Sequence, residues 1–590
     1  MTPYRAPLRD MLFVLHELHG PDMPGGSHCA ELSGELVRSV LEQAARFSES
    51  VLHPLSRSGD EEGCRFENGQ VFTARGFRES FRAYAQAGWL SLACDPHYGG
   101  QGLPIALRAL VEEMICSANL NFASYTNLIQ GAYVLLHQNA SEELKAAYLP
   151  ALVSGAWAAT MCLTEAQSGS DLRLLRSKAI PRDDGSYSVT GQKAFISAGD
   201  HDLTDNIVHL VLARLPDAPA GTRGISLFLV PKLLPDADGR ATRRNSVHCV
   251  SLEAKMGLKA SATCSMSFDG ATGWLVGVPH CGLEVMFTMM NAARLGASLQ
   301  GLGIAQAAYQ AAVAYARERL QGRASAAPEN SAKPADPIIF HPDVRRMLLT
   351  MRASVEGMRA LVQWVAQNLD LRERHPDPEA RRHADEFVSL MTPVLKAMFT
   401  ELGSECANLG VQVLGGAGYI RDHGMEQLVR DVRVTQIYDG TNGIQALDLV
   451  MRKIGRDRLA GRFFEPVRQF LAQDFDNACM KRCVQPFTQA LKILEDATGL
   501  VETAVKSQPE RCAAAATDYL RLFGLVALGF MWVRMAVLSV SHTGGPEADF
   551  YRAKLATARF FLKRLPPQVG ALSQLIATAD TTLTFDPKAF

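Results

Sequence analysis

One carboxylate in the C-terminal half of the chain stands where an enzyme could use it. Asp439 lies between Tyr438 and Gly440 in the stretch QIYDGTNGIQ, residues 436–445. A positioned carboxylate can act as a general base, whereas Asp followed by Gly is also the usual composition of a tight turn. The stretch by itself leaves both interpretations open.

Other arrangements with possible chemistry carry less weight. Cys479 and Cys483 could form half of a metal site, but no second half-site follows, so two small apolar residues one helical turn apart are favoured. GGAGYI (415–420) resembles a dinucleotide-binding loop, yet it follows a helical pattern and lacks the third glycine. The sequence contains no P-loop, HExxH or GxSxG motif, and we expect no metal.

The composition is that of a soluble globular protein. Of the 590 residues, 47% are hydrophobic and 21% are charged, and the net charge of −1 favours neither nucleic acid nor an anionic membrane as a partner. The N-terminal segment MTPYRAPLRD is interrupted by charges, unlike a signal peptide. The longest apolar run near the C-terminus, 522–533, is too short to span a bilayer. Scattered cysteines suit a reducing cytosol, so we expect a cytoplasmic protein.

Hydrophobic periodicity predicts the order helix, sheet, helix. Amphipathic helices are expected over 32–51 and 107–117, and a helical period returns at Leu283. YSVTGQKAFIS, GISLFLVPK and TCSMSF alternate or are bounded by turns, which predicts an antiparallel sheet. The Ala/Pro/Ser-rich stretch 324–337 is expected to be a loop. The predicted parts are an N-terminal extension (1–35), a helical domain (36–155), a β-domain (156–280), a helical bundle (281–460) and an added helical domain (461–590).

Four stretches resemble those typical of acyl-CoA dehydrogenases. They are MCLTEAQSGSDL (161–172), GQKAFISAG (191–199), QVLGGAGYIRDHGMEQLVRD (412–431) and QIYDGTNGIQ (436–445), in the family's order and with its spacing. The resemblance covers about residues 30 to 460. YRAPLRDMLFVLHEL and the added C-terminal region are similar to a larger bacterial branch, which includes methylthiopropionyl-CoA and broad-range fatty acyl-CoA dehydrogenases. The resemblance to this family implies an α+β, mostly helical fold with a middle antiparallel β-domain and a four-helix-bundle-like domain.

The resemblance implies the oxidation of an acyl-CoA thioester to its 2-enoyl form, as in the β-oxidation of fatty acids. FAD accepts the β-hydride, because no protein side chain can do so. Asp439 stands at the position of the base that removes the α-proton, and Arg294 resembles the arginine that borders the catalytic pocket. Substrate contacts are expected from Ser170, Met161 and Gly440, with a backbone N–H at the base position holding the thioester oxygen.

The same resemblance assigns the cofactor contacts. Thr164, Phe195 and Ser197 match positions beside the flavin, with Phe and Ser in place of the family's usual Trp and Thr. The FAD phosphates and adenosine are expected to contact Ser170, Arg319, Gln412, Gly416, Thr441 and Gln445. Because Arg319, Gln412 and Gly416 match contacts made by a neighbouring subunit, a homodimer is expected. Glu165 and Asp171 are favoured as structural residues.

The chain departs from the family at its most important position. The family usually carries Glu where this chain has Asp439, and the alternative site for a glutamate, just before Arg294, is Ala293. Asp is one carbon–carbon bond shorter, about 1.5 Å of reach. A misplacement of about 1 Å can cost on the order of 10²-fold in rate.

Three functions therefore stay open. The first is an FAD-dependent dehydrogenase that passes electrons to electron-transfer flavoprotein. The second keeps the flavin and the thioester pocket but eliminates a group from the acyl chain, or only binds it. The third is a non-enzymatic flavoprotein that uses the added C-terminal region to contact a partner or nucleic acid, although the near-neutral charge argues against nucleic acid.

Overall fold

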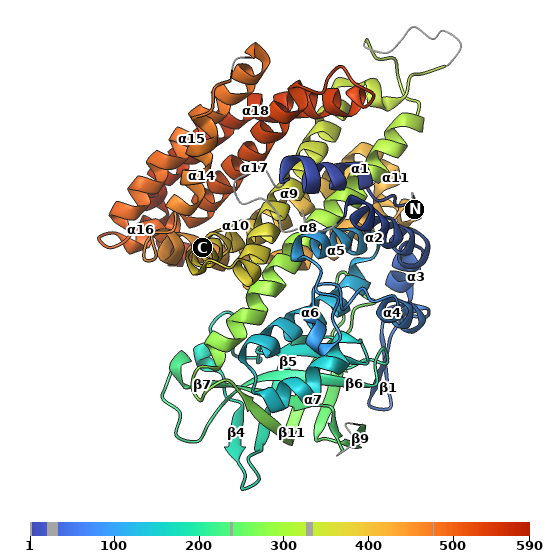
Figure 1. The fold of residues 1–590 in the computed structure, drawn as a ribbon, viewed down its shortest axis with the longest axis vertical. Coiled ribbons are helices and arrows are strands. Elements are labelled where there is room, and N and C mark those ends of the chain that lie inside the picture. The colour runs from blue at the N-terminus through green and yellow to red at the C-terminus, as the bar shows by residue number, and fades with distance from the viewer. Residues whose placement is uncertain (1–2, 21–32, 237–239, 326–333, 476, 590) are drawn as a thin grey trace. The chain divides into compact units, whose positions relative to one another are not determined.

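A computed structural model describes residues 3–20, 33–236, 240–325, 334–475 and 477–589. The chain forms two compact units, drawn in Figure 1. We call residues 1–45, 104–117 and 297–590 the helical unit, and residues 46–103 and 118–296 the sheet unit. Part of the loop predicted for 324–337, residues 326–333, lies outside the described residues.

The helical unit is built from long helices joined by short turns, and α2, α5 and α8 continue into the sheet unit. Its elements are α1 (Leu8–Leu12), η1 (Phe13–Leu18), α2 (Gly34–Phe47), α5 (Ile105–Ala118), α8 (Gly282–Glu318), η7 (Ile338–Phe340), α9 (Pro342–Arg374), α10 (Pro378–Leu414), α11 (Gly416–Tyr419), η8 (Arg421–His423), α12 (Met425–Arg433), η9 (Val434–Gln436), α13 (Asn442–Leu447), η10 (Asp448–Ile454), α14 (Gly461–Leu471), α15 (Ala478–Ala504), α16 (Pro509–Ala514), α17 (Ala516–Val540), α18 (Ala548–Ala577), η11 (Ala579–Thr584) and η12 (Pro587–Ala589).

The sheet unit combines short helices with strands. Its helices are η3 (Ser48–Leu52), α3 (His53–Glu62), α4 (Phe77–Gln86), η4 (Pro96–Tyr98), α6 (Leu120–Asn139), α7 (Glu142–Val153), η5 (Leu172–Leu174) and η6 (Thr222–Gly224). Its strands are β1 (Arg65–Glu67), β2 (Gln70–Phe72), β3 (Trp157–Cys162), β4 (Lys178–Pro181), β5 (Tyr187–Ser197), β6 (Asn206–Arg214), β7 (Ile225–Pro231), β8 (Leu233–Pro235), β9 (Ala241–Arg244), β10 (Val247–Leu252) and β11 (Thr263–Val276).

Seven of these strands form the main sheet, in the order β10-β11-β5-β4-β6-β3, with β7 paired to both β11 and β6. The predicted alternation in TCSMSF is confirmed, because Cys264, Met266 and Phe268 of β11 are buried and the residues between them are half-buried. The predicted strands YSVTGQKAFIS and GISLFLVPK correspond to β5 and β7.

The prediction of an antiparallel sheet is wrong for two strand pairs. β3 runs parallel to β6 along its whole length, and β4 meets β6 in parallel at Lys178 and Arg214. Parallel neighbours need a long crossover connection. Here the segment that contains β4 and β5 connects β3 to β6 along the chain. Local periodicity cannot reveal such a long connection.

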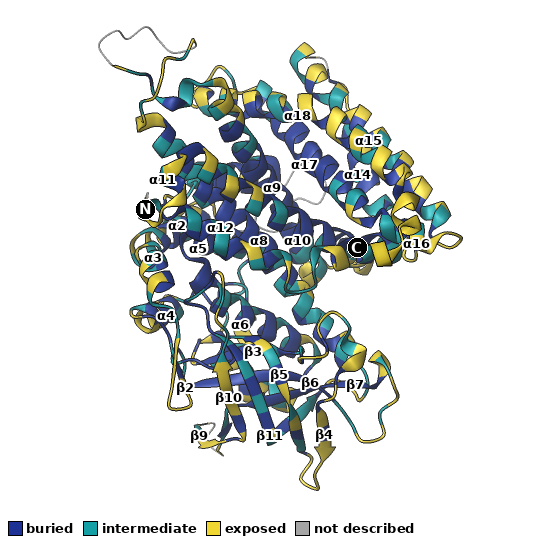
Figure 2. Cartoon of the chain, turned by 180° about the vertical axis from the view of Figure 1, so that it is seen from behind, coloured by how far each residue is buried: buried dark blue, intermediate teal, exposed yellow. Residues whose placement is uncertain are grey.

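Helix α17 is the core of the C-terminal part of the helical unit. The apolar run that was noted over 522–533 belongs to a helix of 25 residues, which is long and apolar enough to cross a membrane, but 83% of its most apolar window is buried against protein. Figure 2 shows α17 almost wholly buried, whereas the neighbouring α15 exposes one face. It packs against α9, α10, α15 and α18, which indicates a core helix.

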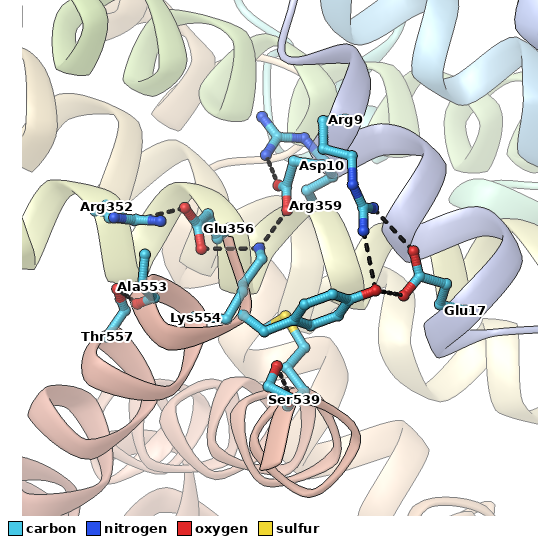
Figure 3. A network of polar contacts seen from close by, with 12 residues as sticks. Arg9, Asp10, Glu17, Arg352, Glu356, Arg359, Ser539, Ala553, Lys554 and Thr557 are labelled. Carbon is cyan, nitrogen blue, oxygen red and sulfur yellow. Dashed lines mark hydrogen bonds and ion pairs between the residues drawn. The ribbon is translucent and has the colours of Figure 1, made fainter. Parts of the chain in front are cut away.

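Buried ion pairs join four helices of the helical unit. Figure 3 shows the pairs that link α1, α9 and α18. The Arg359 cluster consists of Asp10 on α1, Glu113 on α5, Glu356 and Arg359 on α9, and Lys554 on α18. The Arg359 side chain is 1% exposed, binds Asp10, and lies with its Nε 3.0 Å from both carboxylate oxygens of Glu113. Lys554 binds Asp10 and lies 2.8 Å from Glu356 Oε2. The N-terminal segment is thus held by charges that are far from it in sequence.

Candidate active site

Asp439 lies in a turn between η9 and α13, and its backbone conformation is unusual. Asp439 has φ +56° and Gly440 has φ +85°, so two successive residues are left-handed. Most residues avoid this region, whereas Asp and Asn enter it several times more often. Both interpretations of the Asp-Gly pair therefore meet here: it forms a turn, and the turn presents a half-buried carboxylate.

Side chains of the same segment help to hold this turn. The Tyr438 hydroxyl donates to Gln300 Oε1 on α8, and Gln445 Nε2 lies 3.3 Å from the carbonyl oxygens of both Asp439 and Gly440. Thr441 caps α13, its Oγ1 accepting the Ile444 N–H at 3.3 Å. Burial, and next the charge of Asp439, raise the pKa of the Tyr438 phenol well above its usual range.

Gln445 is fully buried, with its amide directed at the turn. Its Oε1 has no hydrogen-bond partner within the described ranges. Its predicted contact with FAD stays a prediction, and the structure adds a role for it in fixing the two carbonyl groups of the turn.

A second set of predicted residues lies in the sheet unit, at the ends of β3 and β5. Phe195 has φ +58° and is 65% exposed, and Ala198 has φ +52°. A left-handed aromatic residue is an outlier, and such strain is concentrated at functional sites. The backbone here presents a large apolar ring to the outside of the unit.

Two hydroxyl-bearing residues lie on the segments next to Phe195. The Ala194 N–H donates to Thr164 O at 2.9 Å, which places the segment after β3 beside β5. Within the part of the chain that the structure describes, the hydroxyl groups of Thr164 and Ser197 have no hydrogen-bond partner. Met161 is half-buried on β3. A flat apolar group with polar edges could bind against this surface.

Glu165 is a structural residue. It is 5% exposed, and its carboxylate accepts from Lys193 Nζ at 2.9 Å, Ser177 Oγ at 2.6 Å and the Arg176 N–H at 2.8 Å. Burial alone would raise the pKa of Glu165, but the charge of Lys193 and these hydrogen bonds outweigh it and lower the pKa to about 2. Glu165 therefore pins the loop after β3 to β5, as favoured from the sequence.

Replacing Glu165 by Gln is expected to cost about 2 kcal/mol of stability at pH 7, because hydrogen bonds to a charged group are lost. The folded pKa is depressed, so this stabilisation is present above the unfolded value of about 4.3 and is lost as the pH falls from there to about 2. Urea unfolding at pH 7 and pH 3.5 checks both statements. Asp171→Asn is the matched control, since Asp171 pairs with Arg173 on the exposed part of the same loop; an equal loss in both variants would contradict the assignment.

Ser170 and Asp171 lie on the exposed side of this loop. Asp171 caps η5, accepting the Arg173 N–H at 3.0 Å, and Ser168 Oγ donates to its carbonyl oxygen at 2.8 Å. Ser170 is exposed. The predicted contacts of Ser170 with FAD and substrate stay predictions, and Asp171 has the structural role that was favoured for it.

Arg294 is buried in the part of α8 that belongs to the sheet unit. It is 5% exposed, its Nη1 lies 3.1 Å from Asn291 Oδ1, and its guanidinium lies 5.7 Å from the centre of the Phe287 ring. Met286 and Met289 on the same helix are fully buried. These two methionines are therefore core residues.

The residues expected to reach a neighbouring subunit are all exposed. Arg319 follows the end of α8, Gln412 lies near the end of α10, and a methyl group added at Gly416 would meet no atom within 4 Å. The side chains of Tyr419 and Ile420 are 83% and 49% exposed. Gly415, with φ +63°, ends α10 by donating to Val411 O, so GGAGYI is a helix end and not a dinucleotide loop.

The sequence interpretation missed the polar side chains beneath the turn. Lys396, Thr400 and Asn442 lie under Asp439 and Gly440, and Lys396 is fully buried. The available signal was a single lysine within the apolar stretch MTPVLKAMFT. A buried lysine is costly unless it has partners, so its position in such a run points to a specific contact.

Comparison with protein families covers nearly the whole chain. Residues 35–156, 160–271 and 280–454 match the family models described as acyl-CoA dehydrogenase N-terminal, middle and C-terminal domains. Residues 463–585 match the model described as acetyl-CoA dehydrogenase C-terminal like. The chain belongs to the acyl-CoA dehydrogenase family.

Individual relatives agree with this. The chain is 41% identical to 3-methylmercaptopropionyl-CoA dehydrogenase of Ruegeria pomeroyi, over 98% of this chain and 99% of that one. It is 32% identical to a broad-specificity linear acyl-CoA dehydrogenase of Mycobacterium tuberculosis, over 100% of both chains. An acyl-CoA dehydrogenase from Bacillus anthracis, solved in complex with FAD, has the same fold with a TM-score of 0.75 and 19% identity, over 96% of this chain and 92% of that one. This chain is accordingly an oxidoreductase of the acyl-CoA dehydrogenase class, with FAD as its cofactor.

The residues present fit a flavin. The isoalloxazine ring is flat and largely apolar with polar edges, and Phe195 offers an exposed ring on the strand that also carries Ser197 and that bonds through the Ala194 N–H to Thr164 O. Thr164, Phe195 and Ser197 would therefore hold the flavin ring.

Proposed function

We propose that Asp439 is the base of a 2,3-dehydrogenation of a saturated acyl-CoA thioester. The observation that supports the proposal is the placement of this carboxylate: it stands on a left-handed, multiply anchored turn in the segment where the family carries its base. Turns that hold a strained conformation need such anchoring, and the strain is typical of functional sites.

In the proposed reaction the α-proton of the thioester moves to Asp439, and the C2–C3 double bond forms as the β-hydride leaves. FAD supplies the acceptor for that hydride. A backbone N–H of the Asp439–Gly440 turn binds the thioester oxygen as negative charge develops on it. Arg294 borders the reacting region, and Ser170 and Met161 contact the substrate.

The remaining cofactor contacts are part of the same proposal. Thr441 and Gln445 contact FAD from the chain that carries Asp439, whereas Arg319, Gln412 and Gly416 contact the FAD of a second subunit in a homodimer. Tyr419 and Ile420 support an interface at this place, because they are adjacent, large and exposed together, and contiguous exposed apolar surface marks interaction sites. The added domain, residues 461–590, enlarges the interface, and light scattering of the purified protein tests for the dimer.

The electron acceptor and the location are proposed from the reaction class. Reduced flavin must be reoxidised by another protein, and electron-transfer flavoprotein is the proposed acceptor. The protein is proposed to work in the cytoplasm, on fatty acyl-CoA or related thioesters and without nucleic acid or a membrane as partner, consistent with its net charge of −1.

Anaerobic titration tests the reaction directly. The purified flavoprotein is titrated with acyl-CoA thioesters of graded chain length and with 3-methylmercaptopropionyl-CoA, and flavin absorbance is recorded. At least one thioester is expected to bleach the flavin stoichiometrically and to yield the 2-enoyl product. If no thioester bleaches the flavin, the result favours elimination, or binding without reaction. A salt-dependent DNA-binding assay then tests the third alternative, a non-enzymatic flavoprotein that contacts nucleic acid.

A further inference from the structure

Lys396 is a buried cation directly beneath the turn that carries Asp439. It lies in the middle of α10 and is fully buried, with Val394, Leu395, Ala397 and Met398 buried around it in the chain. Moving an ammonium group from water into such surroundings is costly unless close partners compensate. The contacts of the Lys396 ammonium group must therefore offset the free-energy cost of burying its charge.

Those contacts are with the turn. Lys396 Nζ lies 2.8 Å from Gly440 O and 3.1 Å from Asn442 Oδ1. Gly440 O also accepts from Gln445 Nε2 at 3.3 Å, so this carbonyl is held from two sides. Asp and Gly adopt left-handed backbone readily, and the contact with Lys396 holds the turn that they form against α10.

Asn442 completes the support. Its Nδ2 lies 3.3 Å from Ala397 O, 3.1 Å from Thr400 Oγ1 and 3.3 Å from Glu401 Oε1, all on α10. Asn442 thus ties the first residue of α13 to one face of α10, and Lys396 reaches the turn from the same face. Removing Asn442 would loosen the turn without removing the positive charge.

Other charged and titratable groups lie near the turn. Glu401 and Glu405 on α10 bind Arg521 on α17, at 3.2 Å and 2.7 Å. Arg433 lies 3.1 Å from Gln436 Oε1, and Cys116 on α5 lies near the phenol of Tyr438. Burial raises the pKa of Glu401, although Arg521 opposes this. Lys396 is therefore the cation whose ammonium group contacts the turn itself.

We propose that Lys396 is a positioning residue for catalysis: it fixes the left-handed turn and its charge keeps the Asp439 carboxylate ionised and able to take the substrate's α-proton. Lys396 Nζ lies 2.8 Å from the carbonyl oxygen of Gly440, the residue that follows Asp439, and a positive charge near a carboxylate favours its ionised form. The proposal rests on the proposed role of Asp439 as the base.

The test is the pH profile of kcat/KM, with the full-length FAD-containing protein and the best substrate from the titration. Lys396→Met removes both charge and donor, and Lys396→Gln removes the charge but keeps a donor for Gly440 O. In both variants the acid limb is expected to move to higher pH, with kcat/KM on that limb reduced about tenfold, because the base is less readily ionised. Only Lys396→Met is expected also to lower the plateau at high pH.

Asn442→Ala is the control for a purely structural role. It is expected to lower the plateau and to leave the acid limb where it is, with FAD content unchanged. An acid limb that does not move in Lys396→Gln overturns the proposal, as does an equal shift in Asn442→Ala. Failure of the base assignment is recognised separately, because Asp439→Asn would then remain active whatever Lys396 does.

Discussion

Asp439→Asn is expected to lower the rate of flavin reduction by about 10²- to 10⁴-fold, the usual contribution of a general base. The amide cannot accept the α-proton, but Asn enters the left-handed region as readily as Asp, so the turn with φ +56° should persist. FAD content and thermal stability should therefore stay near those of the natural protein. Anaerobic stopped-flow mixing with the best acyl-CoA measures the rate, and flavin absorbance per protein measures the content.

Asp439→Glu is the matched variant that keeps the carboxylate. It is expected to retain far more activity than Asp439→Asn, because the base is present and only its position changes. The longer side chain reaches about 1.5 Å further, while a left-handed backbone suits Glu less well than Asp. Full turnover in Asp439→Asn would remove Asp439 from the mechanism and favour elimination or binding.

Local patterns predicted the elements that depend on local physics. The alternation of Cys264, Met266 and Phe268 fixes which face of β11 is buried, because side chains alternate across a strand. The β1–β2 hairpin was overlooked within a region predicted as helical, although Asn68 and Gly69, with φ of +52° and +75°, carry the usual signal of a two-residue turn.

Contacts between distant residues could not be predicted in the same way. Asp10 and Lys554 are 544 positions apart, and a buried ion pair requires that both helices are already placed. Lys396 could be recognised as unusual in an apolar helix, but its partner Gly440 O follows only from the fold. The resemblance located the candidate site, and the structure supplied what holds it.

The largest effect on stability is expected at Arg359. Arg359→Met leaves the Glu113 carboxylate buried, with its main cationic partner removed, and takes one of two cations from Asp10. Breaking a buried pair in this way costs about 3–5 kcal/mol. The urea midpoint should fall accordingly, whereas Lys492→Met, which breaks an exposed pair with Asp496, should change it little.

The pH dependence of Arg359→Met gives the loss a specific signature. Burial already raises the pKa of Glu113, and Arg359 opposes that rise; without Arg359 the carboxyl takes a proton more readily. A raised folded pKa means that stability increases as the pH falls, so the destabilisation should be smaller at pH 5 than at pH 7. Adding Glu113→Gln to Arg359→Met should recover much of the loss at pH 7, because the double variant no longer buries that charge. A double variant no more stable than the single one would show that packing around Arg359, and not the uncompensated carboxylate, determines the cost.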